Sequence, residues 1–274
     1  MSITQIKRQD TDRPILLVLA FFNYDILKRS LESMVGSTSY YKNVEDIPYD
    51  VYILENPSPY SDKIGEYLKK LYKEGRIKGH YRSDDNIGGN IFFRAIIKGL
   101  IAIPNKYVCI SEGDVILDKG SFEETLKLLE KYPHVPLCSI DIHLHNLPVG
   151  NFPNINSWIP EAIDFDDHRI GNTGLQFITI RSDFFIEFLQ AIINKEVNRG
   201  IVFMGNGNFF SDSNLHEFCQ KKEKYWLRTK YRKLLHIGWE LYWNLNNEYY
   251  LYKEQLIKSG KFWSNNDTNI HKIL

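Results

Sequence analysis

The sequence contains few cysteines, carries no net charge and lacks any long apolar run. Its 3 cysteines, Cys109, Cys138 and Cys219, are widely spaced, so they form neither a disulfide framework nor a metal-binding motif. Lys and Arg together number 34, as do Asp and Glu, and this balance argues against a protein that binds nucleic acid. No apolar stretch approaches the ~20 residues of a membrane span, and polar residues 1–13 lack the apolar segment of a signal peptide. We therefore expect a cytoplasmic protein.

A glycine-rich phosphate loop is also missing from the place where many nucleotide-binding folds carry it. The segment that follows the first predicted strand, residues 21–26, contains no glycine. A dinucleotide-binding fingerprint and a Walker loop both require glycines there. Sugar-nucleotide pyrophosphorylases need a glycine-rich loop with Lys and Arg at the same point. These absences disfavour all three classes of nucleotide-binding protein.

What the sequence does contain is an alternation of apolar runs and helical patterns. Its 274 residues, 43% of them hydrophobic, suit a single α/β domain with an appendage. The alternation predicts an α/β sandwich with a parallel sheet, whose ligands bind beyond the carboxyl ends of the strands. The predicted strands are residues 14–22, 49–54, 80–82 and 107–110, and the helices between them are 26–34, 61–72 and 92–103. The polar residues at the strand ends are Asn23, Glu55, Asn86, Glu112 and Asp114.

Two carboxylates separated by one glycine end the fourth of these strands. In extended backbone, residues i and i+2 point to the same face, so Glu112 and Asp114 can converge on one point. Paired carboxylates there favour a hard divalent cation such as Mg²⁺ or Mn²⁺, which prefers oxygen ligands. Gly113 would let the backbone approach a ligand closely. An acidic turn after a strand is the alternative interpretation.

Four segments, in this order, resemble the GT-A glycosyltransferases, and especially their large family-two group. The resemblance covers residues 14–120, and it departs from the family in having Glu rather than Asp at positions 55 and 112. Each Glu keeps the charge and lengthens the reach by one methylene. The segments are Phe21-Phe22-Asn23, Glu55-Asn56-Pro57-Ser58, Asn86-Ile87-Gly88-Gly89-Asn90 with Arg94 after it, and Ser111-Glu112-Gly113-Asp114 at the place of the family's metal motif.

The resemblance implies a fold and an activity. The expected fold is a Rossmann-like GT-A sandwich with a mostly parallel central sheet and a helical C-terminal region. A single domain over residues 1–274 would hold a donor half (about 14–120), an acceptor half (about 121–240) and an aromatic tail (241–274). The expected activity is transfer of a sugar from a nucleotide-sugar donor to a saccharide or lipid-linked acceptor, in the synthesis of a cell-surface polysaccharide or glycoconjugate.

The same resemblance implies roles for individual residues. Glu55 would meet the base or ribose of the donor. Asp114 would bind Mn²⁺ or Mg²⁺ at the diphosphate, and Glu112 would contact the metal or the ribose. A plain Asn-Pro turn at Asn56 and a tight loop at residues 86–89 are the structural alternatives. The predicted nucleotide-sugar-binding residues are Phe21, Asn23, Glu55, Asn56, Asp85, Asn86, Gly89, Asn90, Arg94, Glu112 and Gly113.

The predicted catalytic base lies in the second half of the chain. The family carries an acidic residue at the start of the helix after a turn, and Asp212, which follows the Gly- and Asn-rich segment 205–208, matches it best. An inverting transfer needs such a carboxylate to take the acceptor's proton. The alternative is that Asp212 or Ser213 is simply a helix N-cap, and Glu217 is the second candidate for the base. A faint resemblance of residues 212–215 to retaining enzymes leaves the stereochemical outcome open.

Three further features of the second half are predicted from local patterns. Ser121 and Glu124 predict a capping box for a helix over 121–131. His143 and His145 would share one face of a strand, in a surface or acceptor-facing role rather than a metal site. The residues from 151 to 169 read as one long loop.

The basic, aromatic run 220–233 is predicted to continue a helix. Such helices lie on anionic membranes, which would place the protein at the inner face of the membrane, whereas a solvated helix face is the alternative. His236 follows this run, and many GT-A enzymes bring a late histidine back to the metal, although a core histidine would read the same way. The aromatic tail could pack back onto the domain or form a homodimer interface.

Two rival functions remain open at this stage. A nucleotidyltransferase acting on sugar phosphates would release diphosphate from a nucleoside triphosphate. A non-catalytic nucleotide- or sugar-binding protein would bind its ligand without turnover.

Overall fold

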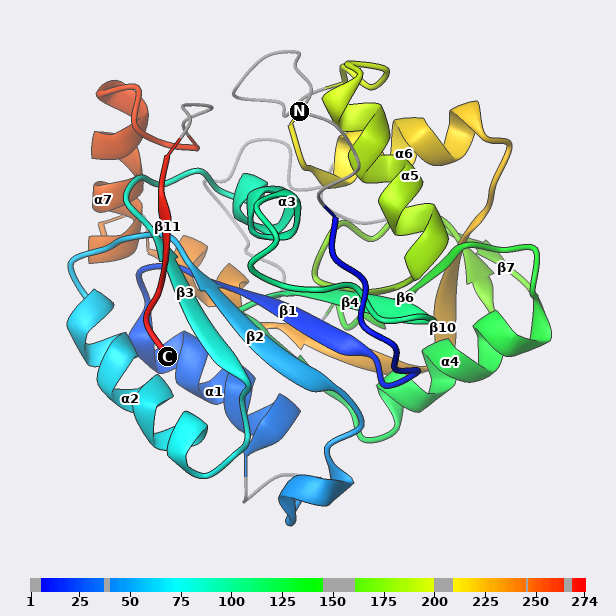
Figure 1. Ribbon diagram of the computed structural model, residues 1–274, viewed down its shortest axis with the longest axis horizontal. Coiled ribbons are helices and arrows are strands. Elements are labelled where there is room, and N and C mark those ends of the chain that lie inside the picture. The colour runs from blue at the N-terminus through cyan, green and yellow to red at the C-terminus, as the bar shows by residue number, and fades with distance from the viewer. Residues whose placement is uncertain (1–5, 37–39, 145–160, 200–208, 245, 264–267) are drawn as a thin grey trace.

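The computed structural model describes residues 6–36, 40–144, 161–199, 209–244, 246–263 and 268–274. Within them a single mixed sheet runs through the molecule, with its strands in the order β11-β3-β2-β1-β4-β9-β6-β10-β8-β7 and β5 paired to β10 (Figure 1). Helices cover both of its faces. The predicted α/β architecture is therefore confirmed.

The first half of the chain forms the parallel part of the sheet. β1 pairs in parallel with β2 and β4, and β2 pairs in parallel with β3. All four strands therefore end at the same edge, as predicted. The elements are β1 (Ile15–Ala20), α1 (Tyr24–Val35), β2 (Asp50–Glu55), α2 (Ser61–Lys73), β3 (Gly79–Ser83), α3 (Asn90–Ile97) and β4 (Tyr107–Glu112).

The second half extends the sheet with antiparallel pairs. β9 lies antiparallel between β4 and β6, and β10 pairs in parallel with β6 and antiparallel with β5 and β8. The elements are β5 (Val115–Leu117), α4 (Ser121–Lys131), β6 (Leu137–Ile142), β7 (Ile163–Asp164), β8 (Arg169–Ile170), β9 (Phe177–Arg181), α5 (Ser182–Ile193), α6 (Asp212–Lys221) and β10 (Trp226–His236).

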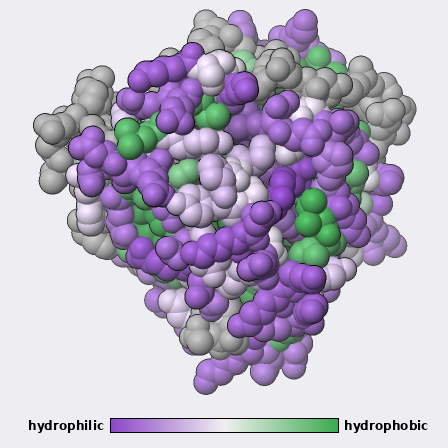
Figure 2. All heavy atoms as spheres, turned by 90° about the vertical axis from the view of Figure 1, so that its left-hand side faces the viewer, coloured by the Kyte–Doolittle hydropathy of each residue, from purple (hydrophilic) through white to green (hydrophobic). Residues whose placement is uncertain are grey.

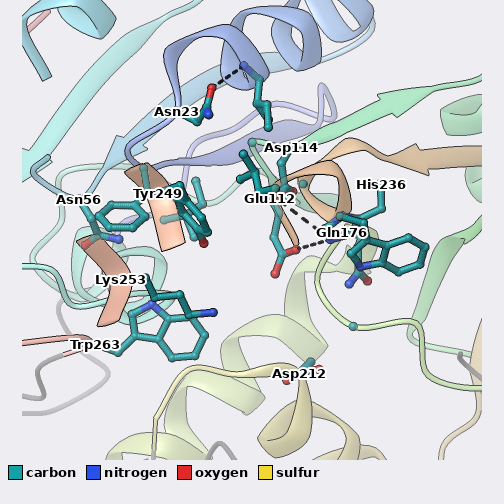
Figure 3. Close-up of a pocket in the computed structure, with 18 of the residues that line it drawn as sticks. Asn23, Asn56, Glu112, Asp114, Gln176, Asp212, His236, Tyr249, Lys253 and Trp263 are labelled. Atoms are coloured by element: carbon teal, nitrogen blue, oxygen red, sulfur yellow. Dashed lines mark hydrogen bonds and ion pairs between the residues drawn. The ribbon is translucent and has the colours of Figure 1, made fainter. Parts of the chain in front are cut away.

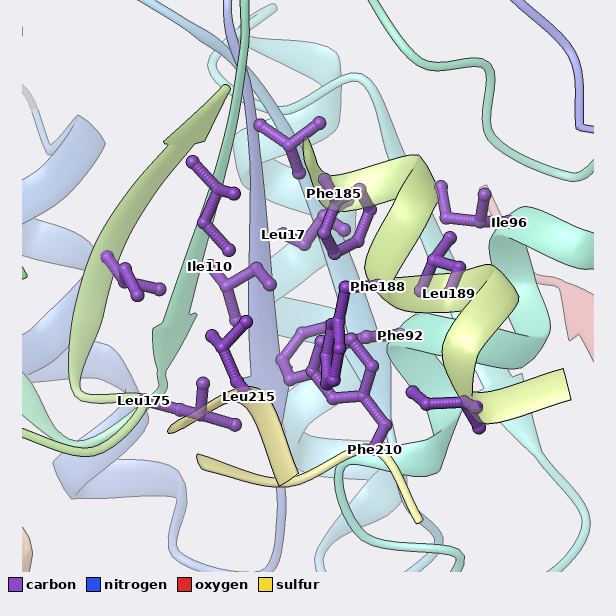
Figure 4. Close-up of a cluster of buried hydrophobic side chains, with 14 of the residues drawn as sticks. Leu17, Phe92, Ile96, Ile110, Leu175, Phe185, Phe188, Leu189, Phe210 and Leu215 are labelled. Atoms are coloured by element: carbon purple, nitrogen blue, oxygen red, sulfur yellow. The ribbon is translucent and has the colours of Figure 1, made fainter. Parts of the chain in front are cut away.

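Two apolar layers sandwich the central strands. Ile15 and Leu17 pack into one buried cluster, while Leu16 and Val18 pack into the other, as the period of two in a strand requires. The first cluster lies under α3, α5 and α6, where Phe92, Phe185 and Phe188 meet strand residues (Figure 4). The continuous apolar runs in the sequence thus reflect burial on both faces.

The prediction of a helix over 220–233 is wrong. Helix α6 ends at Lys221, and β10 begins at Trp226. Arg228, which the sequence pattern places on a basic surface, is 2% exposed and paired with the buried Asp141 of β6. This pairing with a distant strand overrides the local helical pattern. No membrane-lying helix exists here, although Tyr225 and Tyr231 are exposed.

The predicted capping box of α4 is also absent. Gly120 is the N-cap, in left-handed conformation, and the Ser121 hydroxyl donates to the carbonyl of Asp118. The Glu124 carboxylate accepts instead from the backbone N–H groups of residues 230–232 in β10. The helix itself has the predicted bounds, because its apolar spacing is unaffected.

The C-terminal region packs back onto the domain, which is one of the two predicted arrangements. A 3-10 helix, η4 (Ile237–Trp243), leads to α7 (Glu248–Lys258), and the chain returns as β11 (Ile270–Lys272) antiparallel to β3. The face at the left of Figure 1 is mostly hydrophilic, with small separate apolar patches (Figure 2). Among the residues described, no helix has the length and apolarity needed to cross a membrane.

Candidate active site

Three predicted metal ligands meet at the carboxyl end of the parallel strands. Glu112 ends β4, Asp114 follows it, and His236 ends β10, which reaches the site by pairing with β5. Their ligand atoms all lie within 4.8 Å of one another (Figure 3). His236 Nε2 is 3.6 Å from Glu112 Oε2 and 3.9 Å from Asp114 Oδ2. The fold thus joins residues more than a hundred positions apart in one cluster.

Two glycines make this cluster possible. A Cβ on Gly113 would lie 2.3 Å from the carbonyl oxygen of Leu19, so this glycine lets the acidic turn pack against β1. The sequence interpretation gave Gly113 close approach to a ligand; it also lines the pocket described below, so packing against β1 is an additional reason for a glycine here. A Cβ on Gly238 would lie 2.0 Å from Asp114 Oδ2, and the N–H groups of Ile237 and Gly238 donate to the Asp114 carbonyl. The backbone therefore fixes Asp114 next to His236.

The electrostatics of the cluster call for a positive charge. Desolvation raises the pKa of Glu112, a hydrogen bond with His236 opposes that rise, and the charge of Asp114 adds to it. Burial alone would lower the pKa of His236, but the carboxylates of Asp114 and Glu112 outweigh burial and raise it above 6.5. The closeness of the two carboxylates contributes to both shifts, whereas burial raises the pKa of Glu112 and opposes the rise at His236.

The residues present fit a divalent cation. Asp114 Oδ1 is buried without a hydrogen-bond partner, which is costly for a carboxylate oxygen unless a cation or a ligand meets it. Two carboxylates and one imidazole are ligand types that Mn²⁺ accepts. The His236 ring stacks on Trp239 with centroids 4.8 Å apart, which restrains the orientation of its nitrogens.

A pocket of about 470 Å³ opens from the cluster, and Asp212 lies on its other side (Figure 3). Ser211, not Asp212, is the N-cap of α6, because its hydroxyl accepts from the N–H of Asn214 at 3.2 Å. The capping alternative for Asp212 is therefore wrong. Desolvation raises the pKa of Asp212, although hydrogen bonds from Ser213 oppose the rise.

Several pocket residues were missed by sequence reasoning. They come from the turn before β9 and from the C-terminal region, whose positions depend on long-range packing rather than on a strand-end motif. Gln176 is one of them: it lines the pocket, and its Oε1 is buried without a hydrogen-bond partner. The missed residues include Gln176, Gly238, Trp239, Tyr249, Lys253, Phe262 and Trp263.

The predicted nucleotide-binding residues divide into two groups. Phe21, Asn23, Asn56, Glu112 and Gly113 line the pocket, as do the predicted metal ligands and Asp212. The second group, which does not line it, is Glu55, Asp85, Asn86, Gly89, Asn90 and Arg94, and the candidate base Glu217 does not line it either.

Asn86 and Asn90 of the second group shape the loop beside the pocket, together with Asn56 of the first. Asn56 accepts from the N–H of Ile87 at 2.9 Å and donates to the Gly88 carbonyl. Asn86 accepts from the N–H of Gly88 at 3.1 Å. Asn90 accepts from the N–H of Phe210 at 2.8 Å, which ties the loop to the segment that precedes Asp212. The side chains of these asparagines thus form hydrogen bonds with backbone groups of the loop and of its neighbour.

Glu55 turns away from the pocket. Its carboxylate is fully buried, 2.6 Å from His80 Nε2 and 2.9 Å from Arg82 Nε on the neighbouring strand. The predicted contact of this side chain with a base or ribose has no support in this arrangement. The neighbouring Asn56 lines the pocket in its place.

The carboxylate of the second candidate base, Glu217, is already occupied by hydrogen bonds and an ion pair. Its carboxylate accepts from the N–H groups of Asn198 and Arg199, both at 2.9 Å, and pairs with Lys221 at 2.7 Å. Burial raises its pKa, but the hydrogen bonds from Lys221 and the backbone outweigh burial and lower it.

His143 pairs with Asp118, outside the pocket, and His145 lies outside the described residues. The predicted loop is described only from residue 161 on, where it contains β7 and β8.

Comparison with known proteins gives sequence relatives without an established activity. No family model matches the sequence. An uncharacterized protein of Acanthamoeba polyphaga mimivirus is 30% identical over 243 residues, which cover 86% of this chain and 31% of the relative. A second uncharacterized protein of that virus is 27% identical over 258 residues, covering 92% of this chain and 48% of the relative. The chain therefore spans less than half the length of these relatives.

Comparison of structures identifies the fold. The crystal structure of GalNAc-T7 with UDP, GalNAc and Mn²⁺ superposes with a TM-score of 0.53 at 11% sequence identity, over 82% of this chain and 43% of the other. At such low identity the likeness establishes architecture alone. The chain accordingly has the GT-A glycosyltransferase fold that its strand-end motifs resemble.

Proposed function

We propose that this chain is a metal-dependent glycosyltransferase that transfers a sugar from a nucleotide-sugar donor to a saccharide or lipid-linked acceptor. The observation that carries the proposal is the Glu112–Asp114–His236 cluster facing Asp212 across one pocket. The fold supports it, and the superposed GalNAc-T7 structure contains UDP, GalNAc and Mn²⁺. Cell-surface polysaccharide or glycoconjugate synthesis by a cytoplasmic enzyme, with a donor half before residue 120 and an acceptor half after it, stays a prediction.

The chemistry follows from charge. When a nucleotide sugar reacts, its diphosphate leaves and gains negative charge, which a divalent cation held by Glu112, Asp114 and His236 would neutralise. The three side chains converge from the end of β4, the turn after it and the end of β10, and the Gly113 and Gly238 backbones hold them in place. This preorganisation orients the leaving group at one end of the pocket.

Asp212 is the proposed general base. As the acceptor hydroxyl attacks the anomeric carbon, the Asp212 carboxylate takes its proton, and attack opposite the leaving diphosphate inverts the configuration. The raised pKa of Asp212 makes its carboxylate a stronger base than an exposed aspartate. Because Glu217 is held by Lys221 and by backbone N–H groups, it takes no part in this proposal.

The proposal is tested by turnover. The purified protein would be incubated with UDP-, GDP-, CDP- and ADP-sugars, with Mn²⁺ or with a chelator, and release of nucleoside diphosphate would be measured. We expect metal-dependent release from one class of donor, increased by a saccharide acceptor. Release of inorganic diphosphate from a nucleoside triphosphate and a sugar phosphate would instead identify a nucleotidyltransferase. Donor binding without turnover under every acceptor tested would identify a binding protein.

A further inference from the structure

The pocket has a second wall, which the C-terminal region supplies. Tyr249 and Lys253 reach it from α7, with Phe262 and Trp263 beside them (Figure 3). Among the described residues that line the pocket, Lys253 is the only Lys or Arg. The carboxyl groups that line it are those of Glu112, Asp114 and Asp212.

The position of Lys253 is set by aromatic contacts. Helix α7 has no fully buried residue. It is held against the end of β1, where Tyr249 packs on Phe22 with ring centroids 5.6 Å apart and Tyr252 stacks on Phe22 at 5.1 Å. Lys253 follows Tyr249 by four residues and therefore shares its pocket-facing side. The Lys253 ammonium lies 5.5 Å from the centroid of the Phe262 ring.

The charge balance of the pocket indicates what Lys253 could bind. A divalent cation would balance Glu112 and Asp114, and Asp212 must stay negative to act as a base. A donor diphosphate then brings further negative charge that the cation balances only in part. An ammonium group, as a point charge with three N–H donors, suits a phosphate oxygen on the side away from the cation.

We propose that Lys253 binds the diphosphate of the donor. It would do so from the C-terminal wall of the pocket, while the Glu112–Asp114–His236 cluster lies on the other wall. This inference rests on the proposed function, because it assumes that a nucleoside diphosphate group occupies the pocket. It assigns to α7 a part in donor recognition that no strand-end motif carries.

The test measures nucleotide affinity by calorimetry in Mn²⁺. UDP, GDP, CDP and ADP are screened on the wild type, and the tightest binder is compared with its nucleoside, whose weaker binding is followed by ligand-observed NMR. Lys253→Met removes the charge but keeps an unbranched apolar stem against Phe262, and Lys253→Arg restores a charge. Lys258→Met is the matched control, since Lys258 lies on the same helix, exposed and paired with Glu254 at 3.3 Å.

We expect Lys253→Met to weaken diphosphate binding by about 10- to 100-fold, the loss typical of one hydrogen bond to a charged group. Nucleoside binding should stay unchanged, Lys253→Arg should recover most of the affinity, and Lys258→Met should match the wild type. Equal diphosphate affinity of Lys253→Met and the wild type would overturn the inference, as would an equal loss for nucleoside and nucleotide, which would show a packing role. A wild type that binds none of the four diphosphates would contradict the proposed function itself.

Discussion

The two walls of the pocket are built in different ways. The metal-cluster wall consists of the ends of β4 and β10, both buried in the sheet, and its backbone is fixed by Gly113 and Gly238. The C-terminal wall consists of α7 and residues 262–263, and α7 buries none of its residues fully. The comparison teaches that the proposed metal site lies on strand ends within the sheet, whereas the proposed donor contact of Lys253 lies on a segment held through ring stacking.

The largest expected effect is on transfer itself, at the point that both walls face. Asp212→Asn keeps the size of the side chain and leaves the Ser211 cap intact, so the fold should survive. Transfer should fall by roughly 10²- to 10⁴-fold, the usual cost of losing a general base, with donor affinity unchanged. Steady-state kinetics and calorimetry measure the two quantities.

The control for this variant is Asp183→Asn, in the first turn of α5 and exposed. It should transfer at the wild-type rate. Near-normal transfer by Asp212→Asn would remove Asp212 as the base and point to a retaining mechanism.

The second prediction concerns a variant that changes the metal-cluster wall alone. His236→Ala should weaken Mn²⁺ affinity by about 10- to 100-fold, since it removes a proposed ligand. The change should be visible in calorimetric titration of Mn²⁺, with a modest drop in Tm. His271→Ala, an exposed histidine paired with Asp84, is the control. A large drop in Tm with normal Mn²⁺ binding would make His236 a core histidine instead.

A smaller effect is expected from a single methyl group on the same wall. Gly238→Ala would place a Cβ 2.0 Å from Asp114 Oδ2, so the carboxylate must move. We expect Mn²⁺ affinity to fall by about 10-fold, as for other changes that disturb ligand orientation. Gly65→Ala in α2 is the control, because its Cβ would meet Arg82 at an ordinary 3.5 Å. Unchanged Mn²⁺ affinity in Gly238→Ala would show that Asp114 need not be held where it is.

The smallest effect is expected from loosening the C-terminal wall. Tyr252→Ala removes the ring that stacks on Phe22, and such pairs are worth about 0.5–1.5 kcal/mol. The KM for the donor should therefore rise by about 2- to 10-fold, with Mn²⁺ affinity unchanged. Leu251→Ala, at an exposed position of the same helix, is the control. A loss of Mn²⁺ affinity in Tyr252→Ala would show that the two walls are not independent.

The same contrast explains what the sequence could predict. The strands and the acidic pair follow from local patterns, because apolar runs and strand ends mark the active edge of a parallel sheet, whereas Asp212 was predicted from the family resemblance. His236 could be predicted only through the family resemblance, since β10 reaches the site by pairing with β5.

The failures have long-range causes. Glu55 lies opposite Arg82 in the register of β2 and β3 and pairs with it, so a strand-end carboxylate is withdrawn from the pocket. Arg228 is buried and its charge is balanced by Asp141 on β6, and the residues from 226 on, predicted as helix, pair with β6 as strand β10. Lys253 enters the pocket through ring contacts between segments more than two hundred residues apart. None of these pairings leaves a local periodic signal.

The central claim is that the Glu112–Asp114–His236 cluster binds the metal through which the donor is held. The most direct measurement is calorimetric titration of nucleoside diphosphate, with and without Mn²⁺, into the wild type and Asp114→Asn, with Asp62→Asn at an exposed position as control. The account predicts that Mn²⁺-dependent binding is present in the wild type and the control and is lost in Asp114→Asn at unchanged Tm. Unchanged Mn²⁺-dependent affinity in Asp114→Asn would contradict it.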